Sequence, residues 1–584
     1  MKSLSPIFFI LAVSTCSIFF PSHTLTAQNA DPISELSKNS KFFNPNGERM
    51  SSSEATKILN DKEVQIKFPV SPTARLTEYM CGTTHDEEVI YGLGSDGKMH
   101  YFAVGTDVSS TGIKIWQSED MLTWKSIGTV FSRENPPKFS QNPARPFFYE
   151  FKPYKITENG EYTFPNAANE RSLGSPSEFR PFWAPCVYYN VKDKTYYLYY
   201  CCSAFGSRNS FIGCAKSKTV DKGWNDCGIL IHTRRDDGKR FNAIDPAVIA
   251  DADGNPWMIY GSYFGGIALI QLNPKDPSKL LKPGTHGKAI CSRRYVDFLP
   301  QEKRENALRK IRNYESAGYG TEGASLVYDK ERGYYYLFVA YDNLNWAYHT
   351  RVGRSKNIEG PYLDFNGKPM LYDQDEVGHE NVYGTKIVGA YQWTLPNAGW
   401  AATGHTALFR DKNNHLMFGS NSKWNQVPGS FMGLREVLWT NDGWPLLSPQ
   451  LYAGGNQDEI AKVSIPSITA ERPSADWEFV VFSVSHNDGR RTDQAKSYIL
   501  NREGKISKKE TDCSWQLWWT KQGTVMVVIL PDGTAAKGRV AYAWDAYRKR
   551  QTVVFSGITE KGVPVWGERI TPPAFPLSTQ NTAN

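Results

Sequence analysis

One pattern of strands and turns occurs five times in this chain, and it constrains the fold more than any other feature of the sequence. Each unit opens with a short alternating or apolar run, turns on Asp, Lys, Gly or Asn, and continues into a second run of the same kind. A third run follows, and usually a charged segment after it. The units begin at His85, Trp183, Ile244, Thr321 and Gly404. Repetition of this kind predicts an all-β fold built from equivalent sheets.

Units of roughly four strands, spaced about sixty to a hundred residues apart, are typical of a propeller with one blade for each unit. We therefore predict a five-bladed β-propeller over residues 78–450. The spacing exceeds that of a minimal blade, so we expect insertions at 134–180 and 279–320. An array of β-sandwiches would also repeat strands, but it gives no reason for polar residues to recur at the start of every unit.

The chain of 584 residues is too long for one ordinary core, and its pattern changes towards both ends. After residue 450 short strand runs continue without the opening signature. They predict a second domain over 451–584, either a smaller closed β-barrel or a β-sandwich. Residues 28–77 are polar and irregular, and we assign them to an N-terminal extension.

Residues 1–27 are interpreted as a signal peptide, because Lys2 precedes an apolar run and Ala27 offers a plausible cleavage position. A lipoprotein cut before Cys16 is the alternative, although the residues ahead of Cys16 make a poor lipobox. No other stretch is long and apolar enough to be a membrane span. We therefore expect an exported, soluble monomer that is periplasmic, bound at the cell surface or secreted.

The amino-acid composition limits the kinds of ligand that this protein is expected to bind. Aromatic residues make up 13% of the chain, with 17 Trp, and flat rings of this kind pack against sugar faces, although they also fill sheet cores. The net charge of +7 comes without a long basic run, so nucleic-acid binding has little support. Eight of the nine Cys would remain after Cys16 is removed, and none has metal-site spacing. We expect most of them to be buried free thiols.

Three of the five units open with a carboxylate, at Asp86, Asp245 and Glu322. The first strand of every propeller blade lines the central channel, so these side chains should converge. Three acids in one cavity repel each other, and at least one pKa should therefore be raised. A protonated acid beside an ionised base is what glycoside hydrolysis by inversion requires. Each carboxylate alone could be a strand cap or a turn residue, but equivalent places in a repeat favour a shared function.

His405 opens the fifth unit, where a neutral imidazole could hold a cation or its water shell. Calcium prefers oxygen ligands, so a single His implies one channel cation that is held largely by water. Aromatic residues near the unit openings are candidate sugar platforms, and packing in the channel wall is the alternative reading for each. They are Trp183, Tyr263, Phe264, Trp346 and Trp424.

Five motifs in this order, HDEEVI, FWAPCVYY, NAIDPAV, YGTEGASLVY and ATGHTALF, resemble glycoside hydrolase family 43. Within that family they look most like endo-acting α-1,5-L-arabinanases, and the resemblance covers about 78–450. It implies a five-bladed propeller that inverts the anomeric configuration, and arabinan as the substrate. By the same resemblance residues 460–570 look like the lipocalin-like β-barrel domain that larger arabinanases carry.

The resemblance also implies roles for the residues at the unit openings. Asp86 matches the general base, Asp245 the carboxylate that orients the acid and tunes its pKa, and Glu322 the general acid. His405 matches the residue near the channel cation, commonly calcium.

The motifs depart from the family pattern at three positions. Glu87 and Ala324 each stand where Pro is usual, and Cys186 stands where an acidic residue is usual. None of these changes removes a catalytic carboxylate. The change at Cys186 leaves the contacts of the second blade, and hence the exact substrate, open.

We hypothesise that Asp86 deprotonates a water that attacks the anomeric carbon, while Glu322 protonates the departing sugar oxygen. A separation of roughly 6.5 to 9.5 Å between the two carboxyls would leave room for that water. Asp245 would raise the pKa of Glu322 by like-charge repulsion.

Three alternatives stay open from the sequence. An exo-acting α-L-arabinofuranosidase or β-xylosidase could use the same scaffold, because loops between blades decide whether the channel is a groove or a pocket. An exported glycan-binding propeller without catalysis should have lost a carboxylate, whereas this chain keeps all three. A scaffold for protein partners does not explain acids at the unit openings.

Overall fold

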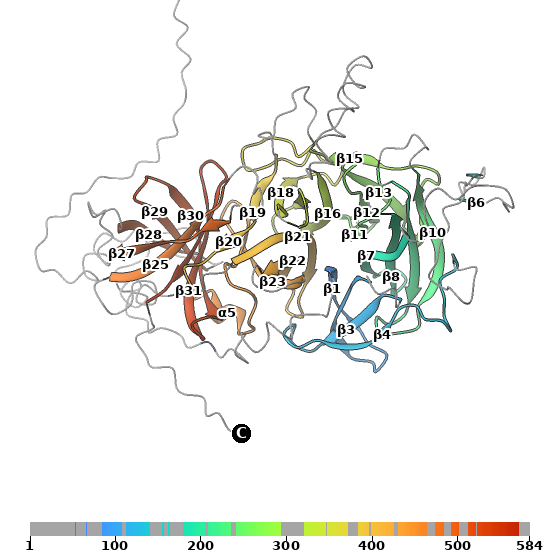
Figure 1. The fold of residues 1–584 in the computed structure, drawn as a ribbon, viewed down its shortest axis with the longest axis horizontal. Helices are drawn as coiled ribbons and strands as arrows, with labels where there is room; N and C mark the ends of the chain where they lie inside the picture. Colours follow the sequence, from blue (N-terminus) through green and yellow to red (C-terminus); the bar gives the residue numbers. More distant parts are fainter. Residues whose placement is uncertain are drawn as a thin grey trace, which may run out of the picture.

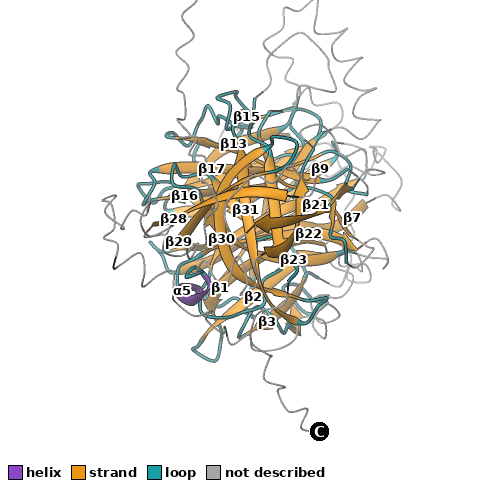
Figure 2. Ribbon diagram, turned by 90° about the vertical axis from the view of Figure 1, so that its left-hand side faces the viewer, coloured by secondary structure: helices purple, strands orange, loops and turns teal. Residues whose placement is uncertain are grey.

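The structure of the protein is a computed structural model. It describes residues 53, 66, 85–107, 112–139, 155–156, 162–163, 179–204, 208–234, 241–293, 320–345, 347–371, 383–395, 399–424, 430–463, 474–483, 492–501, 512–520 and 523–571. The predicted signal peptide, most of the predicted N-terminal extension and Trp346 lie outside these residues. The helices and strands of the described residues are almost all strands, which confirms the all-β prediction (Figures 1 and 2).

Five antiparallel sheets follow one another along the chain. The first has strands β1 (His85–Leu93), β2 (Met99–Thr106), β3 (Lys114–Ser118) and β4 (Lys125–Thr129). The second has β7 (Phe179–Asn190), β8 (Thr195–Ala204), β9 (Ser210–Ser217) and β10 (Asn225–Thr233). The third has β11 (Ala247–Ala250), β12 (Pro256–Tyr260), β13 (Ile267–Asn273) and β14 (Asp276–Leu280), with β15 (Lys288–Cys291) beside β13.

The fourth sheet has β16 (Thr321–Asp329), β17 (Tyr334–Tyr341), β18 (His349–Ser355) and β19 (Thr385–Val388). The fifth has β20 (Tyr391–Gln392), β21 (Gly399–Arg410), β22 (Leu416–Trp424), β23 (Phe431–Trp439) and β24 (Pro445–Leu447). Within the segment where we expected the first insertion, β5 (Lys155–Ile156) and β6 (Tyr162–Thr163) form a small separate sheet.

The strands that open the units, β1, β7, β11, β16 and β21, contact one another in cyclic order, and β1 contacts both β7 and β21. Each adjacent pair of sheets shares a hydrophobic cluster, including the pair formed by the fifth sheet and the first. On β8, for example, Leu198 packs towards the first sheet and Tyr199 towards the third, and both are fully buried. Alternate residues of one strand therefore serve two neighbouring interfaces, which explains why these strands are apolar on both faces.

The last strands form a closed barrel. Its members are β25 (Ser474–Val481), β27 (Lys496–Asn501), β28 (Asp512–Thr520), β29 (Gly523–Ile529), β30 (Ala535–Asp545), β31 (Arg550–Thr559) and β32 (Pro564–Arg569), and one short helix, α5 (Gln457–Ile460), precedes them. Because β25 pairs with both β27 and β32, the sheet closes and a sandwich is excluded. Trp477, Phe479, Met526 and Phe555 are among the side chains of its core.

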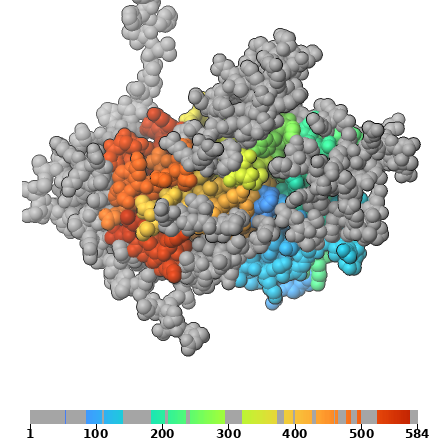
Figure 3. Space-filling view, viewed as in Figure 1, coloured from blue at the N-terminus to red at the C-terminus, as the bar shows by residue number. Residues whose placement is uncertain are grey.

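The barrel packs against the fifth sheet (Figure 3). Trp566 on β32 lies edge-on to Tyr391 of β20 at 5.0 Å and to Phe482 at 4.9 Å, and all three are buried. A short strand, β26 (Asp493–Gln494), extends the fifth sheet by pairing in parallel with β20. The Lys386 ammonium donates to the Ser483 carbonyl at 2.8 Å, so a polar bond also joins the fourth sheet to the barrel segment.

Six cysteines have described side chains; all six are free thiols and five of them are buried, as expected. Among the helices of the described residues, none is both long enough and apolar enough to cross a bilayer.

Candidate active site

Four of the five unit openings lie on β-bulges, whereas Asp245 precedes β11, whose pairing with β12 has no register shift. The strand register shifts between His85 and Glu88 on β1 and between Glu322 and Ser325 on β16, with similar shifts on β7 and β21. Left-handed backbone accompanies these openings: φ is 58° at Asp86, 55° at Asp245 and 51° at His405. Non-glycine residues rarely adopt this conformation, at a typical cost of about 1–3 kcal/mol each, and bulges redirect side chains. The backbone strain therefore collects where the predicted functional side chains lie.

Asp86 has a polar partner on every side of its carboxylate. The Thr106 hydroxyl donates to Oδ2 at 2.7 Å, and His85 Nδ1 lies 2.6 Å from the same oxygen. The Asn421 amide donates to Oδ1 at 2.7 Å, and His405 Nδ1 lies 3.3 Å from that oxygen. A carboxylate offers about four lone-pair positions, so an incoming water must displace one of these partners.

Asn421 was missed by the sequence analysis, because it lies on β22, the second strand of the fifth sheet, and not at a unit opening. Its side chain holds Asp86 twice: Nδ2 donates to the carboxylate, and Oδ1 accepts the Asp86 backbone N–H at 2.9 Å. Only one orientation of the amide satisfies both bonds. Thr106 was also missed; its hydroxyl accepts the backbone N–H of Ala184 at 2.8 Å, which links the second sheet to the base candidate.

Glu322 and Asp245 form a second polar centre. The Ser262 hydroxyl donates to Glu322 Oε2 at 2.8 Å, and Tyr348 also hydrogen-bonds this carboxyl. The backbone N–H of Gly323 donates to Asp245 Oδ2 at 3.1 Å. A side chain at Gly323 would place its Cβ 2.7 Å from the backbone of His405, and φ is 51° there. Glycine thus permits the close approach of the fourth and fifth openings.

Burial acts on all three carboxyls, but their pKa values separate. Burial pushes the pKa of Asp86 upwards, and the positive charge of His85 with the hydrogen bonds outweighs it and holds this pKa below its ordinary range. Burial raises the pKa of Glu322 to about 7, assisted by the charge of Asp86 and opposed by Ser262. Burial and the neighbouring charges of Glu322 and Asp86 raise the pKa of Asp245 well above its usual value. For Glu322 the largest cause is burial, where we expected repulsion from Asp245.

The two histidines beside Asp86 differ in charge. The Asp86 carboxylate raises the pKa of His85 to about 9, so its imidazole is a cation at neutral pH. Burial lowers the pKa of His405, which favours the neutral imidazole. Among the described residues, no group of three or more His, Cys, Asp and Glu is arranged to hold a metal ion. The described residues therefore do not build a calcium cage on their own.

The predicted sugar platforms lie in different settings. Tyr263 and Phe264 both have left-handed backbone and are partly buried. The Tyr263 backbone N–H donates to the Thr321 carbonyl at 2.9 Å, which places it beside the strand that carries Glu322. Trp183 lies on the bulge of β7 and is also partly buried. Trp346 is outside the described residues.

The departures from the family pattern have clear local settings. Ala324 is buried between the third and fourth sheets. Cys186 is buried, and burial together with the charge of Glu88 raises the pKa of its thiol, so an acid from β1 lies near the second opening. Glu87 is buried next to Asp86, burial raises its pKa to about 8, and neither carboxyl oxygen has a hydrogen-bond partner among the described residues.

Comparison with known proteins shows which families and relatives this chain is similar to. The model of the family "Glycosyl hydrolases family 43" matches residues 161–445, and that of a "C-terminal lipocalin-like domain" matches 449–567. An extracellular endo-alpha-(1->5)-L-arabinanase from Thermotoga petrophila is 27% identical over 526 residues, which cover 83% of this chain and 93% of that protein. An extracellular exo-alpha-(1->5)-L-arabinofuranosidase from Cellvibrio japonicus is 31% identical over 288 residues, 46% of this chain and 71% of that protein.

A crystal structure of the endo-1,5-alpha-L-arabinanase from Thermotoga petrophila is similar in fold, with a TM-score of 0.62 and 24% identity over 84% of this chain and 98% of that one. An ionised carboxylate beside carboxyls of raised pKa, held in a ring of sheets, fits the base and the acid that glycoside hydrolysis requires. The chain belongs to glycosyl hydrolase family 43 and carries the lipocalin-like domain after the hydrolase domain.

If Asp86 is the base, Asn421→Ala should lower kcat for glycoside hydrolysis by about tenfold to a hundredfold with little change in KM, because a catalytic group displaced by about an ångström loses that much. Steady-state kinetics together with a thermal melt test this. Asn225→Ala, at the exposed first residue of β10, is the matched control. An unchanged kcat in Asn421→Ala would show that Asp86 is held without it.

Proposed function

We propose that this protein cleaves internal α-1,5-L-arabinofuranosidic bonds in arabinan with inversion of the anomeric configuration. The observation that carries the proposal is the pair formed by Asp86, whose pKa is held low, and Glu322, whose pKa is raised to about 7. Inversion needs one carboxylate and one carboxylic acid at the same pH. The endo-acting relative that covers most of this chain supports arabinan as the substrate.

We also propose that the five sheets are the five blades of a propeller whose inner strands line the catalytic channel. The cyclic contacts of β1, β7, β11, β16 and β21 support this. The division into an extension at 28–77, a catalytic domain at 78–450 and a barrel domain at 451–584 stays a prediction. Export, with removal of residues 1–27, is supported by relatives that are named extracellular.

In the proposed mechanism a water displaces His85 or His405 from Asp86 and takes up a lone pair of its carboxylate. Asp86 accepts a proton from this water as its oxygen attacks the anomeric carbon. Glu322 gives its proton to the departing sugar oxygen, which leaves with the electrons of the broken glycosidic bond. A separation of roughly 6.5 to 9.5 Å between the carboxyls would fit the water between them.

Asp245 is proposed to orient the acid. Its carboxyl accepts the N–H of Gly323, the residue that follows Glu322, so it fixes the backbone from which the acid projects. Burial strongly raises the pKa of Asp245 itself, which favours its protonated form. Asp245 therefore acts beside Glu322 as a neutral carboxylic acid more than as a fixed negative charge.

An exo-acting α-L-arabinofuranosidase is the second candidate, and the Cellvibrio japonicus relative is the observation that favours it. A β-xylosidase would use the same carboxylates with a different pocket. A glycan-binding protein without catalysis has less support, because Asp86, Asp245 and Glu322 are all present and interact electrostatically.

Debranched arabinan should yield a spread of oligosaccharides at early times, because an open groove admits the chain at internal bonds. Chromatography of the products over time tests this, with Asp86→Ala and Glu322→Ala as folded, nearly inactive controls. Arabinose as the sole early product would establish end attack, and no product from the wild-type protein would overturn the proposal.

The rate should fall as pH rises through about 7, because Glu322 must be protonated to act as the acid, and its pKa is raised to about 7. The low pKa of Asp86 keeps the base ionised throughout the mildly acidic range. Ser262→Ala removes a bond that favours ionised Glu322, so its alkaline limb should move to higher pH. Ser278→Ala, which removes a similar bond to Asp276 elsewhere, should leave the profile in place. An unmoved limb in Ser262→Ala would assign that limb to another group.

We further propose that one Ca²⁺ occupies the channel beside His405 and is held largely by water. The neutral state of His405, which lies 3.3 Å from Asp86, supports this. Dialysis against EDTA should lower the melting temperature and the activity, and Ca²⁺ should restore both, whereas His405→Ala should respond to neither treatment. A melting temperature that EDTA leaves unchanged in the wild-type protein would contradict a bound cation.

A further inference from the structure

We propose that Tyr547 of the barrel and Trp424 of the fifth sheet form an aromatic platform that binds a substrate chain beyond the catalytic carboxylates. The inference rests on the proposed function, since the chain that it would bind is arabinan. It gives the barrel a part in substrate binding, which the sequence left unassigned. It also joins Trp424, which the sequence already predicts as a candidate sugar platform, to a ring of the barrel.

The two rings come from different domains and lie against each other. Their centroids are 5.7 Å apart and their planes differ by 24°, so they are stacked. Trp400 packs edge-on against Trp424 at 4.9 Å and supports it from within the fifth sheet. Tyr547 is 40% exposed although Trp424 covers one side of its ring. Because Trp424 covers one face, a ligand would reach the Tyr547 ring at its other face or its edge.

Two chain segments connect the platform to the proposed catalytic residues. Trp424 is three residues beyond Asn421 on β22, about 10 Å along an extended strand. Between them, the Lys423 ammonium interacts electrostatically with Asp86 and donates a hydrogen bond to Asn345 Oδ1 at 3.1 Å. Asn345 in turn is three residues before Tyr348, which hydrogen-bonds Glu322. Lys423 and Asn345 thus connect Asp86 and Glu322 to the platform through one hydrogen bond and short stretches of chain.

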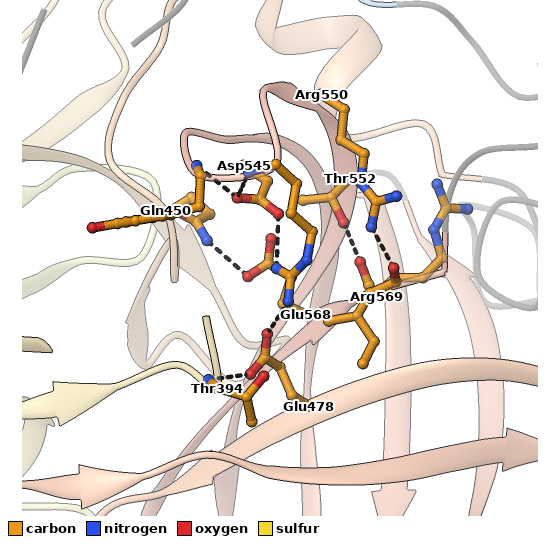
Figure 4. A network of polar contacts seen from close by, with 11 residues as sticks. Thr394, Gln450, Glu478, Asp545, Arg550, Thr552, Glu568 and Arg569 are labelled. Atoms are coloured by element: carbon orange, nitrogen blue, oxygen red, sulfur yellow. Dashed lines mark hydrogen bonds and ion pairs between the residues drawn. The ribbon is translucent and has the colours of Figure 1, made fainter. Parts of the chain in front are cut away.

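A buried polar network fixes the turn that carries Tyr547 (Figure 4). Asp545 Oδ1 accepts the backbone N–H of Tyr547 at 2.9 Å, and its other oxygen accepts from Arg548 at 2.8 Å. Arg548 also donates to Glu478 at 3.0 Å, and Glu478 accepts the backbone N–H of Thr394 at 2.6 Å. Because Thr394 follows β20, the turn is tied to the fifth sheet as well as to the barrel. The Tyr547 ring is therefore held in place before any ligand binds.

A sugar chain fits this surface better than a protein partner. The C–H faces of a furanose pack on an aromatic ring, and a ring that is already immobile loses little entropy on binding. Within the described part of the barrel, Tyr547 is the exposed large hydrophobic side chain. A stable protein interface needs on the order of 1,000 Å² of buried surface, which one exposed ring does not supply.

Tyr547→Ala should raise KM on debranched arabinan by about five- to tenfold and leave kcat unchanged, the loss expected for one stacking contact. KM on arabinotriose should change much less, because a short chain can occupy the centre without reaching the platform. Tyr547→Phe keeps the ring and should behave as wild type. Tyr189→Ala is the matched control, since Tyr189 is 37% exposed and packs on a neighbouring ring, Tyr196, in the second sheet.

Two results would overturn the platform: an unchanged KM on the polymer, or equal increases on the polymer and on arabinotriose. A thermal melt of each variant shows whether the fold is kept. Retardation of an inactive Asp86→Ala protein in gels that contain arabinan, with and without Tyr547→Ala, measures binding apart from hydrolysis. If the wild-type protein does not hydrolyse arabinan but Tyr547→Ala still weakens retardation, the proposed reaction fails and the platform stands. If neither protein is retarded, the platform fails.

Discussion

The pair of hydrogen bonds between Asp86 and Asn421 joins residues 335 positions apart in the chain, on the first sheet and the fifth. The same two sheets also share a hydrophobic cluster, which includes Ala103 and Met417. Burial makes both bonds stronger than they would be in water and makes their loss costly. One side chain therefore contributes to closing the ring of sheets and to holding the left-handed backbone of Asp86. Ring closure and the geometry at Asp86 are thus parts of one interaction.

The same low-dielectric centre gives the carboxyls opposite properties because their partners differ. Asp86 receives hydrogen bonds at both oxygens and the positive charge of His85, so its charged form is stabilised despite burial. Glu322 has neutral donors from Ser262 and Tyr348, which do not offset burial. The contrast follows the general rule that desolvation favours the neutral form of an acid unless charge or hydrogen bonds oppose it. A base and an acid can then coexist at one pH without a large distance between them.

Recurrence predicted Asp86, Asp245 and Glu322 as a group, because equivalent positions in a repeat occupy equivalent places in space. The backbone geometry that orients them has no comparable signal in the sequence, since Asp86, Asp245 and His405 adopt left-handed backbone without being glycine. Asn421 and Thr106 could not be predicted either, because each lies on a second strand and becomes a neighbour of Asp86 only through register. The all-β class and the ring of units followed from strand patterns, whereas the choice between barrel and sandwich depended on the pairing of β25 with β32, a contact between the ends of the domain.

The network that ties the barrel to the fifth sheet costs more than an apolar contact would. Glu478 and Glu568 face each other on β25 and β32, and burial raises the pKa of Glu568 well above its usual value. Buried ionic groups of this kind often stabilise a protein less than hydrophobic residues of similar size, and Trp566 already supplies apolar packing at this interface. Hydrogen bonds differ from apolar packing in their directionality. Bonds from Arg548 and Thr394 specify how the turn at Tyr547 is oriented, and orientation is what a ring must have in order to present one face to a sugar.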